Sequence, residues 1–361
     1  MKRPLKIAII GCGMISDTHV QEIRKIPGTN IMAVCDQEPL MAEQLAERYD
    51  IPRYCSNLQE ILTDCHPDVV HILTPPATHM TLSLTALDAG CNVLLEKPFM
   101  LTVHEAKRVI EKAQNVKRRI TVNHFHNFSP PAVTLRNLFS QGILGDIIHI
   151  ESYYGYNLKS PVAQALLNDA GSWVYHLPGK LMQNNISHLI AQITEFIPDE
   201  SPKVIAYGNR LSNELKRIAH PYVHDELRVL ITGENTSAYG TFSANIRPLQ
   251  HFMTLYGSKH TVSVDYDSGT IVFKHRPRIP GSPGKLLSPV NYARQYLLEA
   301  SKNLIQFTRS RFHYYTGMDT LLRLFYNCIK NDIEVPIPYA EIIKTHKIMD
   351  KIIQQINLKE A

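Results

Sequence analysis

Short apolar runs alternate with helical patterns through the first third of the chain, and this repeat restricts the fold more than any other feature. Residues 5–10 form an isoleucine-rich run that ends at Gly11, as a buried parallel strand does. Repeated β-α units of this length predict a parallel sheet with right-handed crossovers. Further strands are predicted at residues 31–35, 69–73, 92–95 and 119–122, with helices at 16–25, 41–48, 58–63, 79–89 and 103–113.

A glycine turn follows the first strand. Gly11 permits a tight turn, and Gly13 leaves room for a pyrophosphate to approach the backbone at the start of the next helix, beside Met14 and Ile15. The third small position of this pattern is Ser16 rather than glycine, which still allows close helix packing. An ordinary glycine turn is the alternative, but the position between a strand and a helix favours a dinucleotide site.

Asp36 stands directly after the second predicted strand. A carboxylate at this position accepts hydrogen bonds from both ribose hydroxyls and repels a 2′-phosphate. The sequence therefore predicts NAD rather than NADP as the cofactor. The alternative is a solvated turn residue.

Two further strands end in polar or proline-containing turns. Thr74 and Pro75 follow one strand, and Glu96, Lys97 and Pro98 follow another. Ligands of open α/β sheets bind at the carboxyl ends of strands. Lys97 is either a surface charge paired with Glu96 or a group that contacts a reacting hydroxyl, with a pKa that desolvation lowers. A cis peptide before Pro98 would fix the direction of the lysine.

The remaining two thirds of the chain change in character. Short β-branched and aromatic runs, separated by Gly, Asn or Asp, predict an antiparallel sheet. We interpret residues 277–288 as a Pro/Gly loop that is mobile or faces a second copy. The predicted domains are a Rossmann domain at 1–122 and an α+β substrate and oligomerisation domain at 123–361. Predicted strands are 147–154, 203–207, 225–232, 236–244, 251–257, 261–266 and 270–274, followed by helices 292–308, 317–331 and 340–356.

An apolar helix is predicted around residues 180–193, and one of its faces is polar. Lys180, Asn184, His188 and Gln192 recur at every fourth position on this face. Such a stripe either faces solvent on an amphipathic helix or lines water, a partner or a ligand.

Composition excludes several classes of protein. The net charge of +5, from 38 basic and 33 acidic side chains, is mild, and no basic run is longer than residues 117–119, so nucleic-acid binding is not expected. No apolar run approaches the ~20 residues of a membrane helix. None of the six cysteines forms a C-x-x-C pair, so we expect buried thiols in a reducing cytoplasm. The 17 histidines show no metal-binding spacing, so no metal is expected.

The chain resembles the glucose–fructose oxidoreductase / inositol dehydrogenase / MocA (Gfo/Idh/MocA) family in residues 11–16, in Asp36, in residues 74–76 with His79, and in residues 96–98. The resemblance implies a Rossmann domain followed by an α+β domain with a large, mostly antiparallel sheet. It also implies that Lys97 is the catalytic lysine, that Thr74, Pro75 and His79 line the nicotinamide half of the cofactor site, and that Glu96 belongs to this site. A homodimer or homotetramer through the exposed face of the sheet is the implied assembly.

The polar helix carries a second part of the resemblance. Many family members have an Asp here and a His four residues later, whereas this chain has Asn184 and His188; another branch has Asn-Gln-x-x-His. Asn184 cannot take a proton but can orient a hydroxyl. The proton then falls to His188, whose ordinary pKa suits neutral pH, or to Lys97.

The segment after the last Rossmann strand departs from the family. Arginines often precede its Phe, but this chain has His126 and Asn127, which weakens the case for a substrate-binding arginine. His124 and His126 alternate in an extended segment, so at most one is expected to point into the crevice. Three tyrosines, Tyr153, Tyr154 and Tyr156, either stack on a sugar ring or simply pack.

These observations predict a cytoplasmic NAD-dependent oxidoreductase that moves hydride between the nicotinamide and a hydroxyl or carbonyl carbon of a sugar, nucleotide sugar or cyclitol. In this hypothesis the substrate hydroxyl lies between Lys97 and His188, and Asn184 holds a neighbouring oxygen. Two alternatives remain: an NAD-dependent glycosidase that uses transient oxidation, and a non-catalytic protein that senses NAD or a sugar.

Overall fold

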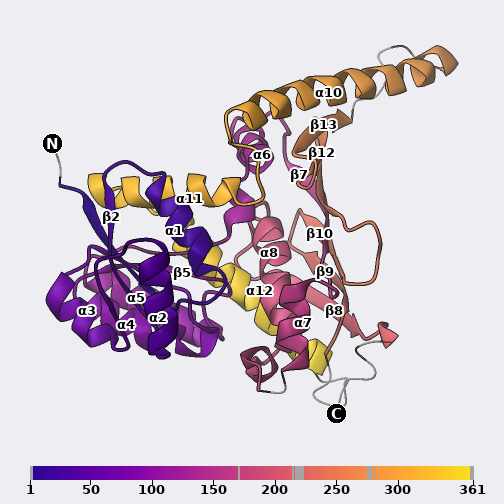
Figure 1. The fold of residues 1–361 in the computed structure, drawn as a ribbon. Coiled ribbons are helices and arrows are strands. Elements are labelled where there is room, and N and C mark those ends of the chain that lie inside the picture. Colours follow the sequence, from indigo (N-terminus) through magenta and orange to yellow (C-terminus); the bar gives the residue numbers. More distant parts are fainter. Residues whose placement is uncertain are drawn as a thin grey trace. The chain divides into compact units, whose positions relative to one another are not determined.

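The computed structural model describes residues 3–169, 171–213, 215, 223–274, 279 and 281–357. The chain forms two compact units (Figure 1). Unit 1 contains Met1–Phe125 and Met318–His346, and unit 2 contains His126–Gly317 and Lys347–Ala361. Each unit has its own sheet, so each is described by itself.

Unit 1 is built on a 6-stranded parallel sheet in the order β3-β2-β1-β4-β5-β6. The strand order reverses between β1 and β4, which is the switch point where such sheets bind ligands. The predicted Rossmann fold is confirmed, and the predicted strands agree to within two residues, although β3 was not predicted. The strands are β1 (Leu5–Ile10), β2 (Thr29–Cys35), β3 (Tyr54–Cys55), β4 (Val69–Ile72), β5 (Asn92–Leu95) and β6 (Ile120–Val122).

The helices of unit 1 follow the strands as the apolar patterns predict. Two of them begin with side-chain caps, because Asn57 accepts a hydrogen bond from the Gln59 N–H and Thr102 accepts one from the Glu105 N–H. They are α1 (Ser16–Arg24), α2 (Pro39–Arg48), α3 (Leu58–Cys65), the 3-10 turn η1 (Pro76–Thr78), α4 (His79–Asp88) and α5 (Val103–Asn115).

Residues far along the chain complete unit 1. The helix α11 (Thr316–Asn331) and the first part of α12 (Tyr339–Asn357) pack with the Rossmann sheet, because α11 buries an apolar face that includes Leu321, Leu322 and Phe325. This differs from the prediction that residues 123–361 form one separate domain. The amphipathic pattern of α11 predicts a helix but not the surface that it covers.

Unit 2 contains a 7-stranded sheet in the order β13-β12-β11-β7-β10-β9-β8. All neighbours are antiparallel except β7 and β10, so the mostly antiparallel sheet is confirmed. The strands are β7 (Ile147–Gly155), β8 (Lys203–Asn209), β9 (Glu226–Thr232), β10 (Ser237–Ser243), β11 (His251–Gly257), β12 (Thr261–Asp265) and β13 (Thr270–Lys274).

One face of this sheet is packed against the helix α8, which contacts β7 and β10. The short helices before α8 were not predicted, since each begins at a proline that also reads as a turn. The remaining helical elements are η2 (Phe125–Phe128), α6 (Pro130–Ser140), α7 (Pro161–Asn168), η3 (Trp173–His176), α8 (Lys180–Thr194) and α10 (Ser282–Thr308).

The predicted loop at residues 277–288 is wrong from Ser282 onward, where α10 begins; residues 277, 278 and 280 lie outside the described residues. Gly281 precedes the helix with a φ of 80°, and Pro283 falls in the first turn, where a missing N–H costs nothing. The helix runs along the edge strand β13 (Figure 1), where the Gln295 side chain bonds both the N–H and the C=O of Phe273.

Three properties bear on the class of protein. No helix in the described part of the chain combines the length and hydropathy needed to cross a membrane. Within the same residues, no group of three His, Cys, Asp or Glu side chains is arranged to hold a metal ion. Five of the cysteines are buried free thiols, as predicted, but Cys55 is only half-buried.

Candidate active site

Gly11 makes the turn that leaves β1. Its φ of +96° is unfavourable for other residues, and a Cβ would lie 2.9 Å from both the Leu73 carbonyl carbon and the Thr74 nitrogen. The first glycine of the motif is therefore required by two independent constraints, the backbone conformation and the closeness of the next strand end.

Gly13 serves a different purpose from Gly11. A Cβ at Gly13 would meet nothing within 4 Å, so its hydrogen faces open space. Ile15 occupies the N-cap position of α1, and no side chain caps that helix start in the described chain. The Ser16 hydroxyl donates to the Gly13 carbonyl at 2.6 Å, and Met14 is 64% exposed. An open backbone at an uncapped helix N-terminus fits a pyrophosphate.

Asp36 lies at the end of β2 and is held by backbone groups. Its Oδ2 accepts the Cys12 N–H at 2.7 Å, and its Oδ1 accepts the Glu38 N–H at 3.0 Å. Burial and the charge of Asp36 raise the pKa of Cys12 to about 12. The structure thus holds the Asp36 side chain beside the glycine turn, where its oxygens can also accept hydrogen bonds from hydroxyl groups.

His79 connects two turns of the candidate cofactor site. Its Nδ1 lies 3.0 Å from the Phe99 carbonyl, and its Nε2 lies 2.9 Å from the Thr74 carbonyl. The ring is fully buried, and burial lowers its pKa. His79 therefore holds the turn at Thr74 and Pro75 against the turn after β5, and the exposed surface of the first turn is left to Thr74 and Pro75.

Glu96 and Lys97 form the turn after β5. The Lys97 N–H donates to Glu96 Oε2 at 3.2 Å, and the Lys97–Pro98 peptide is cis. Burial lowers the pKa of the Lys97 ammonium, and the charge of Glu96 partly opposes this. A lysine with a lowered pKa at a strand end suits proton transfer.

The polar stripe on α8 is buried. Asn184 is 7% exposed and His188 is 4% exposed, so the solvent-exposed alternative is wrong. The preceding segment is anchored to this helix, because Asn127 Nδ2 donates to the Ala191 carbonyl at 3.3 Å and Arg136 pairs with Glu195. The sequence shows the period of the stripe, but not that other elements of the fold cover both faces of the helix.

His188 belongs to a cluster of rings that comes from several elements of unit 2. The His126 ring lies 4.6 Å from the His188 ring and 4.8 Å from the His251 ring, between ring centres. Tyr154 lies 5.8 Å from His188, and the hydroxyl of Tyr314 lies 3.4 Å from His126 Nε2. These side chains combine hydrogen-bonding groups with aromatic faces, which is the chemistry that sugar binding uses.

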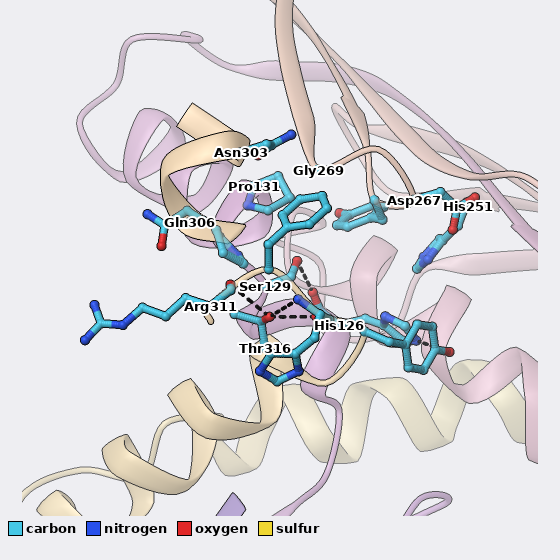
Figure 2. A pocket seen from close by; sticks show the side chains of 15 residues that line it. His126, Ser129, Pro131, His251, Asp267, Gly269, Asn303, Gln306, Arg311 and Thr316 are labelled. Carbon is cyan, nitrogen blue, oxygen red and sulfur yellow. Dashed lines mark hydrogen bonds between the residues drawn. The ribbon is translucent and has the colours of Figure 1, made fainter. Parts of the chain in front are cut away.

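A cavity of about 240 Å³ opens beside this cluster within unit 2 (Figure 2). His126, His251 and Tyr314 belong to both the cluster and the cavity wall. In Figure 2 the Arg311 side chain extends away from the other labelled groups. The other lining residues are Ser129, Pro130, Pro131, Tyr266, Asp267, Gly269, Asn303, Gln306, Phe312, His313 and Thr316.

The ring cluster around His188 distinguishes residues whose positions the sequence alone could not separate. Tyr154 faces α8, whereas Tyr153 stacks on Phe252 with ring centres 5.5 Å apart. His126 lines the cavity, whereas His124 belongs to unit 1, where burial and the nearby charges of His346 and Lys97 lower its pKa to about 3.

Sequence reasoning missed His251 and Tyr314. His251 Nε2 lies 3.0 Å from Gln192 Oε1, so this residue continues the polar stripe of α8 onto β11. The sequence did contain a signal for His251. This histidine begins a predicted strand and shares one face with Met253 and Leu255. A polar side chain among buried apolar ones needs a hydrogen-bond partner.

Comparison with known proteins agrees with this geometry. Residues 5–124 match the family model GFO_IDH_MocA, described as "Oxidoreductase family, NAD-binding Rossmann fold". The D-glucoside 3-dehydrogenase of Escherichia coli (strain K12) is 32% identical over 145 residues, which are 40% of this chain and 41% of that protein. The scyllo-inositol 2-dehydrogenase (NAD(+)) of Bacillus subtilis (strain 168) is 26% identical over 177 residues, 48% of this chain and 51% of that protein. The matched region thus spans about half or less of these curated relatives.

A solved structure extends the likeness to both units. The WlbA dehydrogenase from Bordetella pertussis, in complex with NADH and UDP-GlcNAcA, superposes with a TM-score of 0.78 at 17% sequence identity. The superposition covers 99% of this chain and 97% of that one. At this identity the likeness establishes the fold of the whole chain.

Proposed function

Since this chain belongs to the Gfo/Idh/MocA oxidoreductase family through its Rossmann unit, we propose that it is an NAD-dependent dehydrogenase of a sugar, nucleotide sugar or cyclitol. The observation that carries the proposal is the turn of Glu96 and Lys97 at the end of β5, in the same unit as the glycine turn and the fixed Asp36 carboxylate.

The cofactor is held by groups of unit 1. The open backbone at Gly13 and the start of α1 at Met14 and Ile15 receive the pyrophosphate. Asp36 receives the adenosine ribose, and its charge favours NAD over NADP. Thr74 and Pro75, held in place by His79, line the nicotinamide half with the turn at Glu96.

The substrate is held by groups of unit 2. The cavity of about 240 Å³ is smaller than the ~300–1,000 Å³ of sites for drug-sized ligands, so it suits a single sugar or cyclitol ring. The imidazoles of His126 and His251 and the hydroxyl of Tyr314 offer donors and acceptors for ring hydroxyls.

His188, Lys97 and Asn184 carry out the chemistry. His188 takes the proton of the substrate hydroxyl, Asn184 orients a neighbouring oxygen, and Lys97 is the catalytic lysine of unit 1. A bound NAD would supply the hydride acceptor for this chemistry. The ring contacts of His188 with His126 and Tyr154 fix the plane of its imidazole, which orients the nitrogen that removes the proton.

The first test is the appearance of NADH when the protein, with excess NAD, meets a panel of sugars, sugar acids, cyclitols and nucleotide sugars. We expect absorbance at the NADH band with one class and none with NADP in place of NAD. The Lys97→Ala variant, which keeps the cofactor turn at Gly11, is the control for background reduction. Silence with every class would contradict a net dehydrogenase.

A glycosidase that uses transient oxidation gives a different result in the same assay. It needs the same cofactor groups but releases no net NADH, so a chromogenic glycoside would be cleaved while the NADH band stays absent. Ligand-dependent binding of another protein, with neither signal, would support the sensing alternative instead.

We also propose that two or four copies associate through the outer face of the unit 2 sheet. Ile205, Tyr207, Leu230 and Tyr239 are between 40% and 66% exposed on this face, more apolar surface than a monomer usually leaves open. Sedimentation at micromolar concentration should show a dimer or tetramer; a monomer alone would reject this assembly.

A further inference from the structure

A row of buried polar side chains in unit 1 leads from α11 to the turn that carries Lys97. The hydroxyl of Tyr326 lies 2.8 Å from His71 Nε2. His71 Nδ1 lies 2.9 Å from His19 Nδ1, and His19 Nε2 lies 2.9 Å from Glu96 Oε1. The row thus joins α11, β4, α1 and the end of β5 through side chains alone.

The row is closed to solvent along its length. His19 and His71 have no exposed surface, and Tyr326 is 1% exposed. Buried imidazoles cost free energy unless they are hydrogen-bonded, and charging them costs more. Burial and the neighbouring His19 lower the pKa of His71 well below its ordinary value, so His71 is neutral at physiological pH.

The position of each proton follows from the two facing Nδ1 atoms. At 2.9 Å one of them must carry hydrogen and the other must accept it. When His19 is neutral, a carboxylate at Glu96 requires its Nε2 to donate, so His19 Nδ1 accepts from His71 Nδ1–H, and His71 Nε2 accepts from the hydroxyl of Tyr326. Every donor in the row therefore points toward Glu96, which lets each hydrogen bond strengthen the next.

Glu96 is suited to receive this row as a carboxylate. Besides His19, it accepts Asn123 Nδ2–H at 2.6 Å and the Lys97 N–H at 3.2 Å. Burial raises its pKa, but the hydrogen bonds from His19 and Asn123 and the charge of Lys97 lower the pKa overall. The charge of Glu96 in turn supports the ammonium of Lys97.

We propose that Tyr326, His71 and His19 are positioning residues that keep Glu96 ionised and aligned, and that they thereby control the protonation of Lys97. This inference rests on the proposed catalytic role of Lys97. It gives one buried residue in each of α1, β4 and α11 a part in the reaction, although no sequence motif identifies these residues.

Removing the hydroxyl of Tyr326 should weaken the row without reversing it. In Tyr326→Phe the Nε2 lone pair of His71 loses its donor, while the hydrogen bonds from His71 Nδ1–H to His19 and from His19 Nε2–H to Glu96 remain. The remaining hydrogen bonds lose the polarisation that the hydroxyl supplied, so Glu96 is held less firmly as a carboxylate. Lys97 then loses part of the charge that supports its ammonium.

Other titratable groups near this turn do not compete in the neutral range. Asn123 does not titrate, whereas the pKa values of His79 and His124 respond to the charge of Glu96 and, for His124, of Lys97. Burial lowers both pKa values, that of His124 to about 3. Burial therefore moves the titration of both histidines away from the range in which a lysine ammonium loses its proton.

The first arm of the test reads the tautomers directly, with no substrate. In ¹⁵N-histidine-labelled protein we expect His71 protonated on Nδ1 and His19 on Nε2, with signals assigned from His19→Gln and His71→Gln. In Tyr326→Phe both tautomers should persist, while the His71 Nε2 signal moves to that of an imidazole nitrogen without a donor. The opposite tautomers in the wild type, or titration of His71 near pH 6.5, would overturn the inference.

The second arm reads Lys97. The acetylation rate of Lys97 by acetic anhydride, followed by mass spectrometry from pH 6 to 10, should show a midpoint a few tenths of a unit lower in Tyr326→Phe, because the variant removes only the polarisation of the row. Phe325→Leu, at the neighbouring fully buried ring of α11, is the control and should leave the midpoint unchanged. Equal midpoints in wild type and Tyr326→Phe would reduce the row to a structural role. If the proposed function alone fails, both arms still give the expected results while no sugar yields NADH.

Discussion

The candidate sites of the two units differ in whether backbone or side-chain groups hold their residues in place. In unit 1 the backbone holds the groups at two of the strand ends: Asp36 accepts two backbone N–H groups, and His79 lies between two backbone carbonyls. In unit 2, side chains hold one another, as in the contacts of His126 with His188 and His251.

This difference suits the two kinds of ligand. A cofactor common to many enzymes needs a fixed outline, which strand ends and turns supply. A substrate that differs between enzymes needs a surface that can change without moving the backbone, and a cluster of rings supplies one. The variants below either break one site while sparing the other or measure how each is held.

The largest effect is expected at His188. His188→Ala should lower kcat by about 10²–10⁴, since it removes the proposed proton acceptor, while NAD affinity stays unchanged because the cofactor groups belong to unit 1. Steady-state rates with deuterated substrate, together with NADH titration, measure the two properties. Asn185→Ala, at a buried neighbour on α8, is the control for packing. Near-normal turnover with a full isotope effect would remove His188 from the chemistry.

The charge of Asp36 comes next. Asp36→Asn keeps an oxygen that can accept the Cys12 N–H but removes the charge, so NAD affinity should fall about tenfold or more and the preference over NADP should weaken. Fluorescence titration with NADH and NADPH measures both. Asp17 on α1 forms an ion pair with Arg48 on α2. The control variant Asp17→Asn removes one negative charge there and should alter neither affinity. An unchanged preference in Asp36→Asn would mean that the carboxylate only holds the turn.

The positions of the residues in the candidate cofactor site were largely predictable, because the strands and turns that carry them depend on local sequence. Strand ends at Gly11, Asp36 and Lys97 follow from apolar runs and the turns after them, and a parallel sheet brings such ends to one edge. Ser16 replaces the third glycine of the pattern, and its small side chain fits the turn because its hydroxyl donates to the Gly13 carbonyl.

The rest depends on contacts between distant residues. Tyr326 and His71 are 255 positions apart in the sequence, and the local sequence around each residue does not predict their contact. The stripe at His188 has the period of an exposed face, and only the packing of the whole unit shows that it is buried. Similarly, the start of α10 at Ser282 was not predicted, because Gly281 and Pro283 by themselves favour a loop. In the fold they occupy the N-cap and the first turn of the helix.

The two glycines of the turn should separate stability from binding. Gly11→Ala forces a Cβ against Leu73 and Thr74 at a φ of +96°, so it should cost about 1–3 kcal/mol of unfolding free energy. Gly13→Ala meets no atom within 4 Å and should leave stability within about 0.5 kcal/mol while weakening NAD binding. Urea denaturation followed by circular dichroism, with NADH titration, compares them. Equal stability of the two variants would refute the distinction.

The smallest effect concerns how unit 2 tolerates acid. Burial lowers the pKa of His251 from its ordinary value near 6.5 to about 3. Above pH 6.5 the residue is neutral in both folded and unfolded chains, so it adds no pH dependence. Between pH 6.5 and 3 only the unfolded chain takes the proton, so the free energy of unfolding falls as the pH falls, by about 1 kcal/mol between pH 7.5 and 5.5.

His251→Gln removes this proton uptake and still offers a donor to Gln192, so its stability should fall by about 1 kcal/mol less than that of the wild type over the same range. Trp173, the single tryptophan, lies in unit 2 and reports its unfolding by fluorescence in urea. His313→Gln, at an exposed histidine of the same unit, should keep the wild-type dependence on pH. If His251→Gln also keeps it, His251 is protonated in the folded state, and the ring cluster is wetter than the side-chain packing of unit 2 implies.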